Sequence, residues 1–415
     1  MTFMEGKFMK NLGKLATFLM VSVFTLNLVA CDKRGNKNVG KTTIRFSTWD
    51  NAETLQFQEE MVEKYNNSQD KVHVEIEGYG SNYDTKITAG IGSKDAPDVM
   101  YMWNYPKYGD ALENLDPYIS KQGDDYKNDF YEALWIYNQV GGKTLGIPVG
   151  YTTHVVYYNK SLFKEAGLSF PEGEWSFDEL REAAKKISDP SKKIYGLGLP
   201  IKPDPYDFEM FAWSNGGAFA DNEGKYDPII ASKETTEPFQ LFQDMIKEGS
   251  AISGDSMGED AFKMGTVAMF INGAWSLQSL KDSDIDYGVA LLPNFSDKKS
   301  VSIVSSSGIA MSKDSKNKEA AWDFIKYWTN AEMNIARLNY ELPVLKSVAE
   351  SEKLTTDPIH GKFYEMLERS TEHVPSSFTV SDWTSLSDKI SLALEQVLNI
   401  NEAKEASNAF GEILE

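Results

Sequence analysis

The chain of 415 residues contains a single cysteine, Cys31. One cysteine cannot form an intramolecular disulfide or supply a cysteine-based zinc site. The four histidines form no H-E-x-x-H motif, and no two have the spacing of ligands on one helix face: His73, His154, His360 and His373. No G-x-S-x-G nucleophile elbow is present. The sequence therefore indicates no metal, no cofactor and no familiar catalytic motif. We expect a binding protein rather than an enzyme, although a glycosidase needs only two distant carboxylates.

Positive charge is scarce. Lys and Arg number 42 against 62 Asp and Glu, which gives a net charge of −20. Nucleic acids and anionic membranes need clustered cations, so neither is an expected partner. Hydrophobic residues make up 41% and charged residues 25%, as in folded soluble proteins. The length predicts two or three domains of roughly 150 residues each. Aromatic residues reach 12%, enough for a core and for flat binding surfaces.

Long hydrophobic runs are absent apart from residues 15–30. This run is shorter than the roughly 20 apolar residues that span a bilayer. Three lysines precede it, Lys7, Lys10 and Lys14. A positive start, a short apolar run and a small residue at the end are typical of a secretory signal peptide, here residues 1–30.

The cysteine comes directly after this leader. Leu28-Val29-Ala30-Cys31 resembles the bacterial lipobox, in which the cysteine is lipidated and becomes the mature N-terminus. The polar residues that follow, rich in Gly and Asn, predict a flexible tether over 31–42. The alternative is an ordinary signal peptide that ends near a cysteine. We expect lipidation of Cys31 and attachment to the membrane by this anchor only.

Strand-like and helix-like patterns then alternate along the chain. Alternating apolar residues predict strands and 3.6-residue spacing predicts helices. The first set is strand 44–47, helix 55–65, strand 71–77, helix 83–91 and strand 98–103. A second set begins after Pro148, and the last third of the chain is mostly helical. This order predicts an α/β fold with largely parallel sheets.

Several segments carry a family resemblance. Residues 146–168, GIPVGYTTHVVYYNKSLFKEAGL, closely resemble the signature of extracellular solute-binding proteins of ABC importers, in the maltose and multiple-sugar group. Further segments agree with that family in the same order: Ala96-Pro97-Asp98-Val99, Asn215-Gly216-Gly217, Phe262 to Trp275, and Leu342-Pro343-Val344. The resemblance extends from about Ile44 to the C-terminus.

The resemblance implies a type II periplasmic-binding-protein fold, with two α/β lobes joined by hinge segments around a ligand cleft. It places the three crossings near residues 151–154, 303–307 and 341–344. The N-terminal lobe would comprise 43–152 and 308–341, and the C-terminal lobe 153–307 and 342–415. The family closes around its ligand by hinge rotation, and a permease recognises the closed form. We therefore expect a monomer at the extracellular face of the cytoplasmic membrane that delivers a sugar to ABC permease subunits.

Sugars need aromatic rings for their C–H faces and polar groups for their hydroxyls. The resemblance implies stacking by Trp275, by Trp383 and by Tyr206, which follows Pro205. The alternative for each is a role in packing, and for Trp213 packing in the core is the stronger interpretation. We interpret Trp135, Trp322 and Trp328 as core residues because they have helical spacing with other apolar residues.

Polar candidates follow the predicted strands or lie on the crossings. Ligands of α/β sheets bind beyond the carboxyl ends of strands. The candidates after the first and third strands are Trp49, Asp50, Asn51, Glu53, Trp103 and Asn104, with capping of the next helix as the alternative for Asp50 and Asn51. The candidates on the first and second crossings are Tyr151, Thr152, Ser306 and Ser307.

The function that follows is the capture of a di- or oligosaccharide. Thr152 stands where the maltose proteins have a charged residue, and Asp207 follows Tyr206 in place of an aromatic residue. The identity of the sugar therefore stays open. Two alternatives remain: a secreted carbohydrate hydrolase, and a binding protein for a non-sugar solute.

Overall fold

A computed structural model describes residues 40–254, 258–295, 297–399, 401 and 403–415. The predicted leader, Cys31 and nearly all of the predicted tether lie outside these residues. Residues 41–415 form one compact unit. Among the described residues, no helix is long and apolar enough to cross a membrane.

The first sheet has five strands in the order β2-β1-β3-β12-β6. Strands β1, β2 and β3 run parallel, whereas β12 is antiparallel to both β3 and β6. The expectation of a largely parallel sheet therefore holds only for the first three strands. The bounds of these strands are Thr42–Thr48 for β1, Val72–Gly78 for β2, Val99–Met102 for β3, Gly146–Thr153 for β6 and Val304–Met311 for β12.

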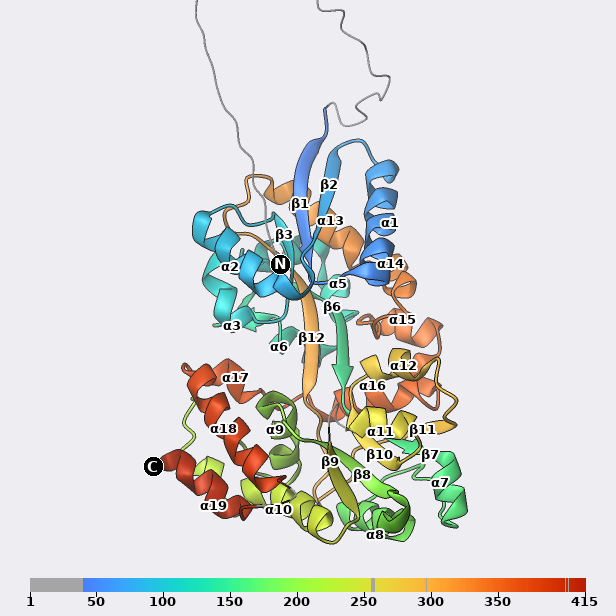
Figure 1. Cartoon of the computed structure of the whole chain (residues 1–415). Coiled ribbons are helices and arrows are strands. Elements are labelled where there is room, and N and C mark those ends of the chain that lie inside the picture. Colours follow the sequence, from blue (N-terminus) through green and yellow to red (C-terminus); the bar gives the residue numbers. More distant parts are fainter. Residues whose placement is uncertain (1–39, 255–257, 296, 400, 402) are drawn as a thin grey trace, which may run out of the picture. The chain divides into compact units, whose positions relative to one another are not determined.

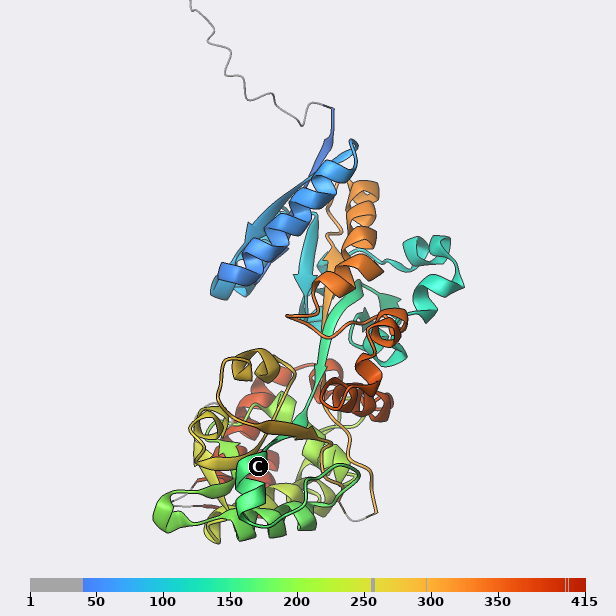
Figure 2. The same cartoon turned by 90° about the vertical axis from the view of Figure 1, so that its right-hand side faces the viewer.

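Helices pack against this sheet, and apolar residues fill the space between them. Ile44 and Phe46 are fully buried, as their alternation with polar residues predicts. The ring of Phe46 contacts those of Phe324 and Trp328 at 5.2 and 5.0 Å. The principal helices are α1 (Ala52–Ser68), α2 (Tyr83–Ser93), α13 (Lys318–Trp328) and α14 (Ala331–Ala336), with α1 and α13 seen best in Figure 2. The predicted core positions of Trp135, Trp322 and Trp328 are confirmed, since all three are buried.

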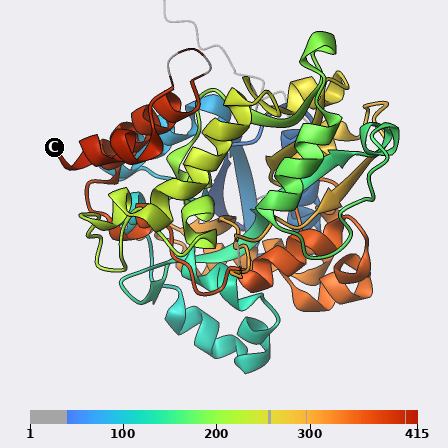
Figure 3. The same ribbon diagram turned by 90° about the horizontal axis from the view of Figure 1, so that it is seen from below.

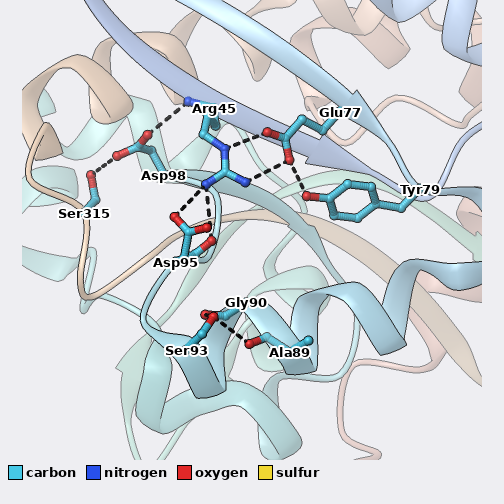
Figure 4. A network of polar contacts seen from close by, with 9 residues as sticks. All are labelled: Arg45, Glu77, Tyr79, Ala89, Gly90, Ser93, Asp95, Asp98 and Ser315. Carbon is cyan, nitrogen blue, oxygen red and sulfur yellow. Dashed lines mark hydrogen bonds and ion pairs between the residues drawn. The ribbon is translucent and has the colours of Figure 1, made fainter. Parts of the chain in front are cut away.

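A polar network ties the ends of these strands together (Figure 4). The Arg45 guanidinium donates to Glu77 at 2.6 Å and to Asp95 at 3.2 Å. Asp98 accepts from the Arg45 backbone N–H at 3.0 Å and from Ser315 Oγ at 2.5 Å. The Asp98 carboxylate therefore joins β1 to the segment after β12, which gives this residue a structural role.

The second sheet has the order β11-β7-β10-β8-β9. Strands β10, β8 and β9 are parallel, whereas β7 is antiparallel to β10 and β11. Helices α8 and α10 contact this sheet and face the viewer in Figure 3. The bounds are Val155–Asn159 for β7, Tyr195–Pro200 for β8, Ala251–Gly254 for β9, Val267–Asn272 for β10, Tyr287–Ala290 for β11, Phe177–Ile187 for α8 and Lys233–Lys247 for α10.

A capping box explains where helix α8 begins. Ser176 Oγ accepts from the Glu179 N–H, and the Glu179 carboxylate accepts from the Ser176 N–H, which makes a complete capping box for α8. The other helices that concern the site are α7 (Lys160–Glu165), α9 (Pro205–Ser214), α11 (Glu259–Lys263), α12 (Trp275–Leu280) and α18 (Trp383–Val397).

Short elements complete the described chain. They are α3 (Tyr105–Tyr108), α4 (Asp116–Ile119), α5 (Asp124–Asn128), α6 (Glu132–Ile136), β4 (Gln139–Val140), β5 (Lys143–Thr144), α15 (Lys346–Ser351), α16 (His360–Arg369), α17 (Ser376–Thr379) and α19 (Ala406–Gly411).

The three predicted crossings lie next to one another. Strands β6 and β12 pair from Thr153↔Val304 to Gly146↔Ala310, with a register shift at Ser307/Gly308. An isolated bridge then joins Tyr151 to Leu342. Both long strands extend from the first sheet toward the second (Figure 1). Strand β12 begins at Val304, within the predicted second crossing.

Candidate ligand-binding cavity

A cavity of about 800 Å³ lies at the crossings and is lined by β6 and β12 of the first sheet and by the first residues of α9, α12 and α18. This volume is within the roughly 300–1,000 Å³ of small-molecule sites. Most of the residues expected at the site line it: Trp103, Asn104, Tyr151, Thr152, Tyr206, Trp275, Ser306, Ser307 and Trp383.

Trp275 is presented to the cavity on a rigid support. Its side chain opens α12 and is 46% exposed. Thr152 Oγ1 accepts from the Ala274 N–H at 2.5 Å, which fixes the start of α12 to the first crossing. The buried ring of His154 meets Trp275 edge-on, with centroids 5.5 Å apart and an interplanar angle of 86°. A Cβ on Gly273 would lie 2.6 Å from the indole, so only glycine fits there. An exposed indole held in this way suits a stacking surface.

Two further aromatic residues sit at helix starts. Tyr206 is in the first turn of α9, and its hydroxyl donates to the Val304 carbonyl at 2.8 Å. Trp383 is the first residue of α18. The caps of these helices are Asp204 and Asp382, which accept from the Tyr206 and Ser385 N–H groups at 2.9 and 3.4 Å. The positive ends of α9 and α18 are thus occupied by the protein's own carboxylates.

The crossings supply polar groups to the cavity. Asn138 donates to Ser306 Oγ at 3.2 Å, and Ser307 Oγ donates to the Gly150 carbonyl at 3.4 Å. Glu341 of the third crossing lies against Gly150, where a Cβ would be 2.6 Å from its carboxyl carbon. The absence of a side chain at Gly150 makes room for this carboxylate.

Glu341 has a buried cation behind it. Arg337 Nε lies 3.4 Å from Glu341 Oε2, and the guanidinium donates to the Trp328 carbonyl at 2.8 Å. Burial raises the pKa of Glu341, while the charge of Arg337 lowers it and that of Asp50 raises it. This arrangement holds an acceptor at the edge of the cavity.

The remaining candidates do not line the cavity. Trp49 packs against Tyr83 and Tyr101, with centroids 5.4 and 5.0 Å away. Asp50 accepts from Thr48 Oγ1 at 2.8 Å and Gln58 Nε2 at 2.6 Å, so its carboxylate is satisfied within the protein. The others are Asn51, which precedes α1 but makes no side-chain cap; Glu53, which is exposed; and Trp213, which is buried beside His373.

Comparison with known proteins identifies the family to which the chain belongs. The sequence profile described as "Bacterial extracellular solute-binding protein" matches residues 49–335. The chain belongs to this family.

The relatives of this solute-binding protein include a maltotriose-binding protein of Pyrococcus abyssi. It is 29% identical over 286 residues, which cover 66% of this chain and 60% of that protein. The match thus spans less than two thirds of that relative's length. Among solved structures, an ABC substrate-binding protein of Listeria monocytogenes in complex with cycloalternan is 25% identical with a TM-score of 0.73. That match covers 90% of this chain and 97% of the other.

A further solved structure matches the fold at lower identity. A Mycobacterium tuberculosis protein in complex with glycerophosphocholine is 21% identical with a TM-score of 0.77, over 90% of this chain and 97% of the other. The predicted fold class, an α/β fold of two lobes in the periplasmic-binding-protein manner, is confirmed by these likenesses. Such proteins bind solutes for ABC importers, as the resemblance predicted.

In this solute-binding protein, two of the residues expected to bind the sugar have structural roles. Tyr151 is 5% exposed, and its ring packs against Tyr364 at 5.7 Å. It contributes little surface for stacking. Asn104 caps α3 by accepting from the Lys107 N–H at 3.1 Å. Trp103, by contrast, is 51% exposed at the cavity.

Other residues at the cavity were not predicted. Asp204 could have been found, since Asp before Pro is a common helix start. Glu341 lies in the predicted third crossing but was not chosen. Asp207 was noted beside Tyr206 as a departure from the maltose proteins but was not chosen as a site residue. Others carry no sequence signal of a site, among them Lys107, Tyr137, Tyr340 and Phe378. The fully buried Tyr137 ring meets Phe378 edge-on at 5.7 Å.

A buried acid holds the loop before Trp383 in place. Glu209 on α9 accepts from the Ser376 N–H at 2.9 Å, from the Ser376 hydroxyl and from the Phe219 N–H at 3.2 Å. Burial raises the pKa of Glu209 to about 7 although these donors lower it. Glu209 thus connects α9 to α17, which leads into the loop that lines the cavity.

Proposed function

We propose that this protein captures a di- or oligosaccharide in the cavity and delivers it to an ABC permease. The observation that carries the proposal is the combination of Trp103, Tyr206, Trp275 and Trp383 with carboxylates and hydroxyls around one cavity. Aromatic faces suit the apolar side of a sugar ring, and the polar groups suit its hydroxyls. The maltotriose and cycloalternan named for two similar proteins support a sugar ligand.

The charges around the cavity disfavour an anionic solute. Four carboxylates line it, those of Asp204, Asp207, Glu341 and Asp382, against one cation, Lys107. The N-termini of α9 and α18, which could bind a phosphate, carry their own Asp caps. A neutral sugar fits this surface better than a phosphate ester.

A hydrolase remains the second candidate. Burial raises the pKa of Asp207 to about 7, and a carboxyl that stays protonated near neutral pH could act as a general acid. The solute-binding relatives favour binding without turnover. Incubation with neutral oligosaccharides should leave them intact, whereas the release of shorter products would favour the hydrolase.

We further propose export and lipid anchoring through residues 1–31. The leader pattern, the lipobox-like segment and the family support this location. The lobes would divide as predicted, at 43–152 with 308–341 and 153–307 with 342–415. The composition of the two sheets supports this division. If Cys31 is lipidated, Cys31→Ala should release the protein from membranes into the medium, and equal retention of the variant would contradict the anchor.

The experiment that tests the proposed function is a melting-temperature screen against neutral oligosaccharides, including maltose, maltotriose and cycloalternan. A ligand that binds only the native state raises its apparent stability, by about 2.7 kcal/mol at a hundred times Kd. We expect an upward shift with at least one of these sugars and none with glucose 1-phosphate. A shift with the phosphate alone would contradict the proposal.

A further inference from the structure

Asp207 is a carboxylate at the cavity without a donor. It lies in the first turn of α9 and lines the cavity, and its side chain is 17% exposed. No described residue donates a hydrogen bond to it. The nearest ionisable nitrogen, His154 Nε2, is 3.7 Å away, which is beyond hydrogen-bond length. A largely buried carboxylate without a donor is costly, and such a group in a native protein calls for an explanation.

The acids around Asp207 differ from it in this respect. Asp204 and Asp382 accept from helix N–H groups, and Glu341 lies beside Arg337. Glu209, two residues further along α9, has three donors. Among the described acids that line the cavity, Glu341 also has a carboxylate oxygen without a hydrogen-bond partner, but a guanidinium lies beside it. Asp207 alone has neither a hydrogen-bond donor nor a permanent cation beside it.

His154 does not fill the gap. Its ring is fully buried, and neither ring nitrogen has a hydrogen-bond partner in the described chain. Burial lowers the pKa of His154 to about 3, so the imidazole is neutral at physiological pH. The ring therefore supplies no positive charge to Asp207. His154 also contacts Trp275, so a single side chain, that of His154, connects Asp207 to the indole.

We propose that Asp207 is a specificity-determining residue whose carboxylate is reserved for hydroxyl donors of the sugar unit that stacks on Trp275. This inference rests on the proposed function. The ligand completes the hydrogen bonding that the protein leaves open, so sugars that lack free hydroxyls at this point are rejected. A negatively charged group there meets like charge and is rejected as well.

The same geometry couples binding to a proton. Burial raises the pKa of Asp207 to about 7, and the negative charge of Asp204 raises it further. The other ionisable groups that line the cavity are Tyr137, Tyr151, Tyr206, Tyr340, Lys107, Glu341 and Asp382. Hydroxyl donors from the ligand favour the charged carboxylate, so binding lowers this pKa and releases a proton. The association constant should rise with pH by up to about tenfold per unit below pH 7 and level off above it.

The test compares wild type with Asp207→Asn by titration calorimetry, using maltotriose, cycloalternan and the strongest binder from the oligosaccharide screen. At pH 8 we expect Asp207→Asn to bind at least tenfold more weakly. Near pH 7 the wild type should release up to about half a proton per sugar, measured in buffers of different ionisation enthalpy, and the variant none. The sugar-free variant should melt at an equal or higher temperature at pH 8, since a buried charge has been removed.

The control is Asp98→Asn, an acid outside the cavity with two protein donors. It should melt earlier and keep its affinity within twofold. Equal affinity of Asp207→Asn and wild type, without proton release, would overturn the role of Asp207 but not the proposed function. Early melting of Asp207→Asn with unchanged affinity would make the residue structural. A wild type that binds no sugar at all would overturn both.

Discussion

Trp275 and Trp322 lie in opposite environments, one 46% exposed at the cavity and the other 4% exposed against Tyr118. Trp275→Ala should weaken sugar binding by about 2 kcal/mol or more, roughly thirtyfold, because a stacking anchor is lost. The melting temperature of the sugar-free variant should change little. Calorimetric titration and thermal unfolding measure the two effects.

Trp322→Ala is the matched control for this pair. It should lose about 3–5 kcal/mol of unfolding free energy and, where it folds, bind sugar normally. The reverse pattern, with Trp275→Ala melting early and binding normally, would make Trp275 structural.

Glu209 should make stability depend on pH. Its pKa is about 7 in the folded protein and about 4.3 when unfolded, so the folded state binds more protons between these values. The free energy of unfolding should therefore fall as pH rises from about 4.3 to 7. Glu209→Gln removes this contribution. Relative to wild type, Glu209→Gln should lose about 1 kcal/mol of unfolding free energy, because a hydrogen bond to Ser376 is lost. This loss should be largest at pH 5 and smaller at pH 8.

Denaturant unfolding of both proteins at pH 5, 6.5 and 8 gives this difference directly. Asp207 is present in both proteins and changes their unfolding free energy with pH in the same direction. The difference between the two proteins therefore reports on Glu209. A deficit that stays constant with pH would show that Glu209 is ionised throughout.

Single residues of the cavity were predictable where a family segment or a helix start pointed to them. Trp275, Tyr206 and Trp383 belong to such segments, and the structure brings all three to the cavity. Trp49 and Asp50 follow the first strand as a ligand residue would, but Trp49 packs against Tyr101, which is far away in sequence, and Asp50 accepts from Gln58 on the following helix. Local pattern cannot show that these side chains are already satisfied.

At the scale of elements, the contact between β6 and the third crossing depends on one missing side chain. A methyl group at Gly150 would lie 2.6 Å from the Glu341 carboxyl carbon. Gly150→Ala should push Glu341 away from Arg337, lowering the melting temperature by several degrees and weakening sugar binding. Thermal unfolding with and without sugar measures both.

Gly92→Ala is the matched control, since a Cβ at this position in α2 meets nothing within 4 Å. It should be neutral or stabilising by up to about 1 kcal/mol, because alanine favours helix. If Gly150→Ala behaves in the same way, the close approach of Glu341 is not needed.

Long elements with a regular pattern were predicted well. The predicted helix 83–91 corresponds to α2, and the predicted strand 98–103 corresponds to β3. The short helices from α3 to α6, of four or five residues each, were not predicted, because so short a segment shows no periodicity. The antiparallel insertion of β12 was also beyond local pattern, since its partners β3 and β6 are far away in sequence.

For the whole molecule, a cavity lined by strands of the first sheet and by helices α9, α12 and α18 predicts a change of size on binding. Closure around a sugar adds contacts from both sides, so the ligand favours the closed form. We expect a smaller radius of gyration by X-ray scattering with saturating sugar than without. Identical scattering at saturation, with binding verified in the same sample, would argue against hinge closure.

The position of β12 has a consequence for the order in which the protein can form during synthesis. This strand joins β3 to β6 in the first sheet, yet it leaves the ribosome after the entire second sheet. The first core therefore cannot close until residue 311 has been made. A fragment ending at residue 300 should show no cooperative unfolding of the first sheet by circular dichroism and protease resistance, and a sharp transition there would contradict this. A nascent chain whose first core stays open until late in translation can still pass through an export channel in an extended form. This suits the export that we propose for the leader.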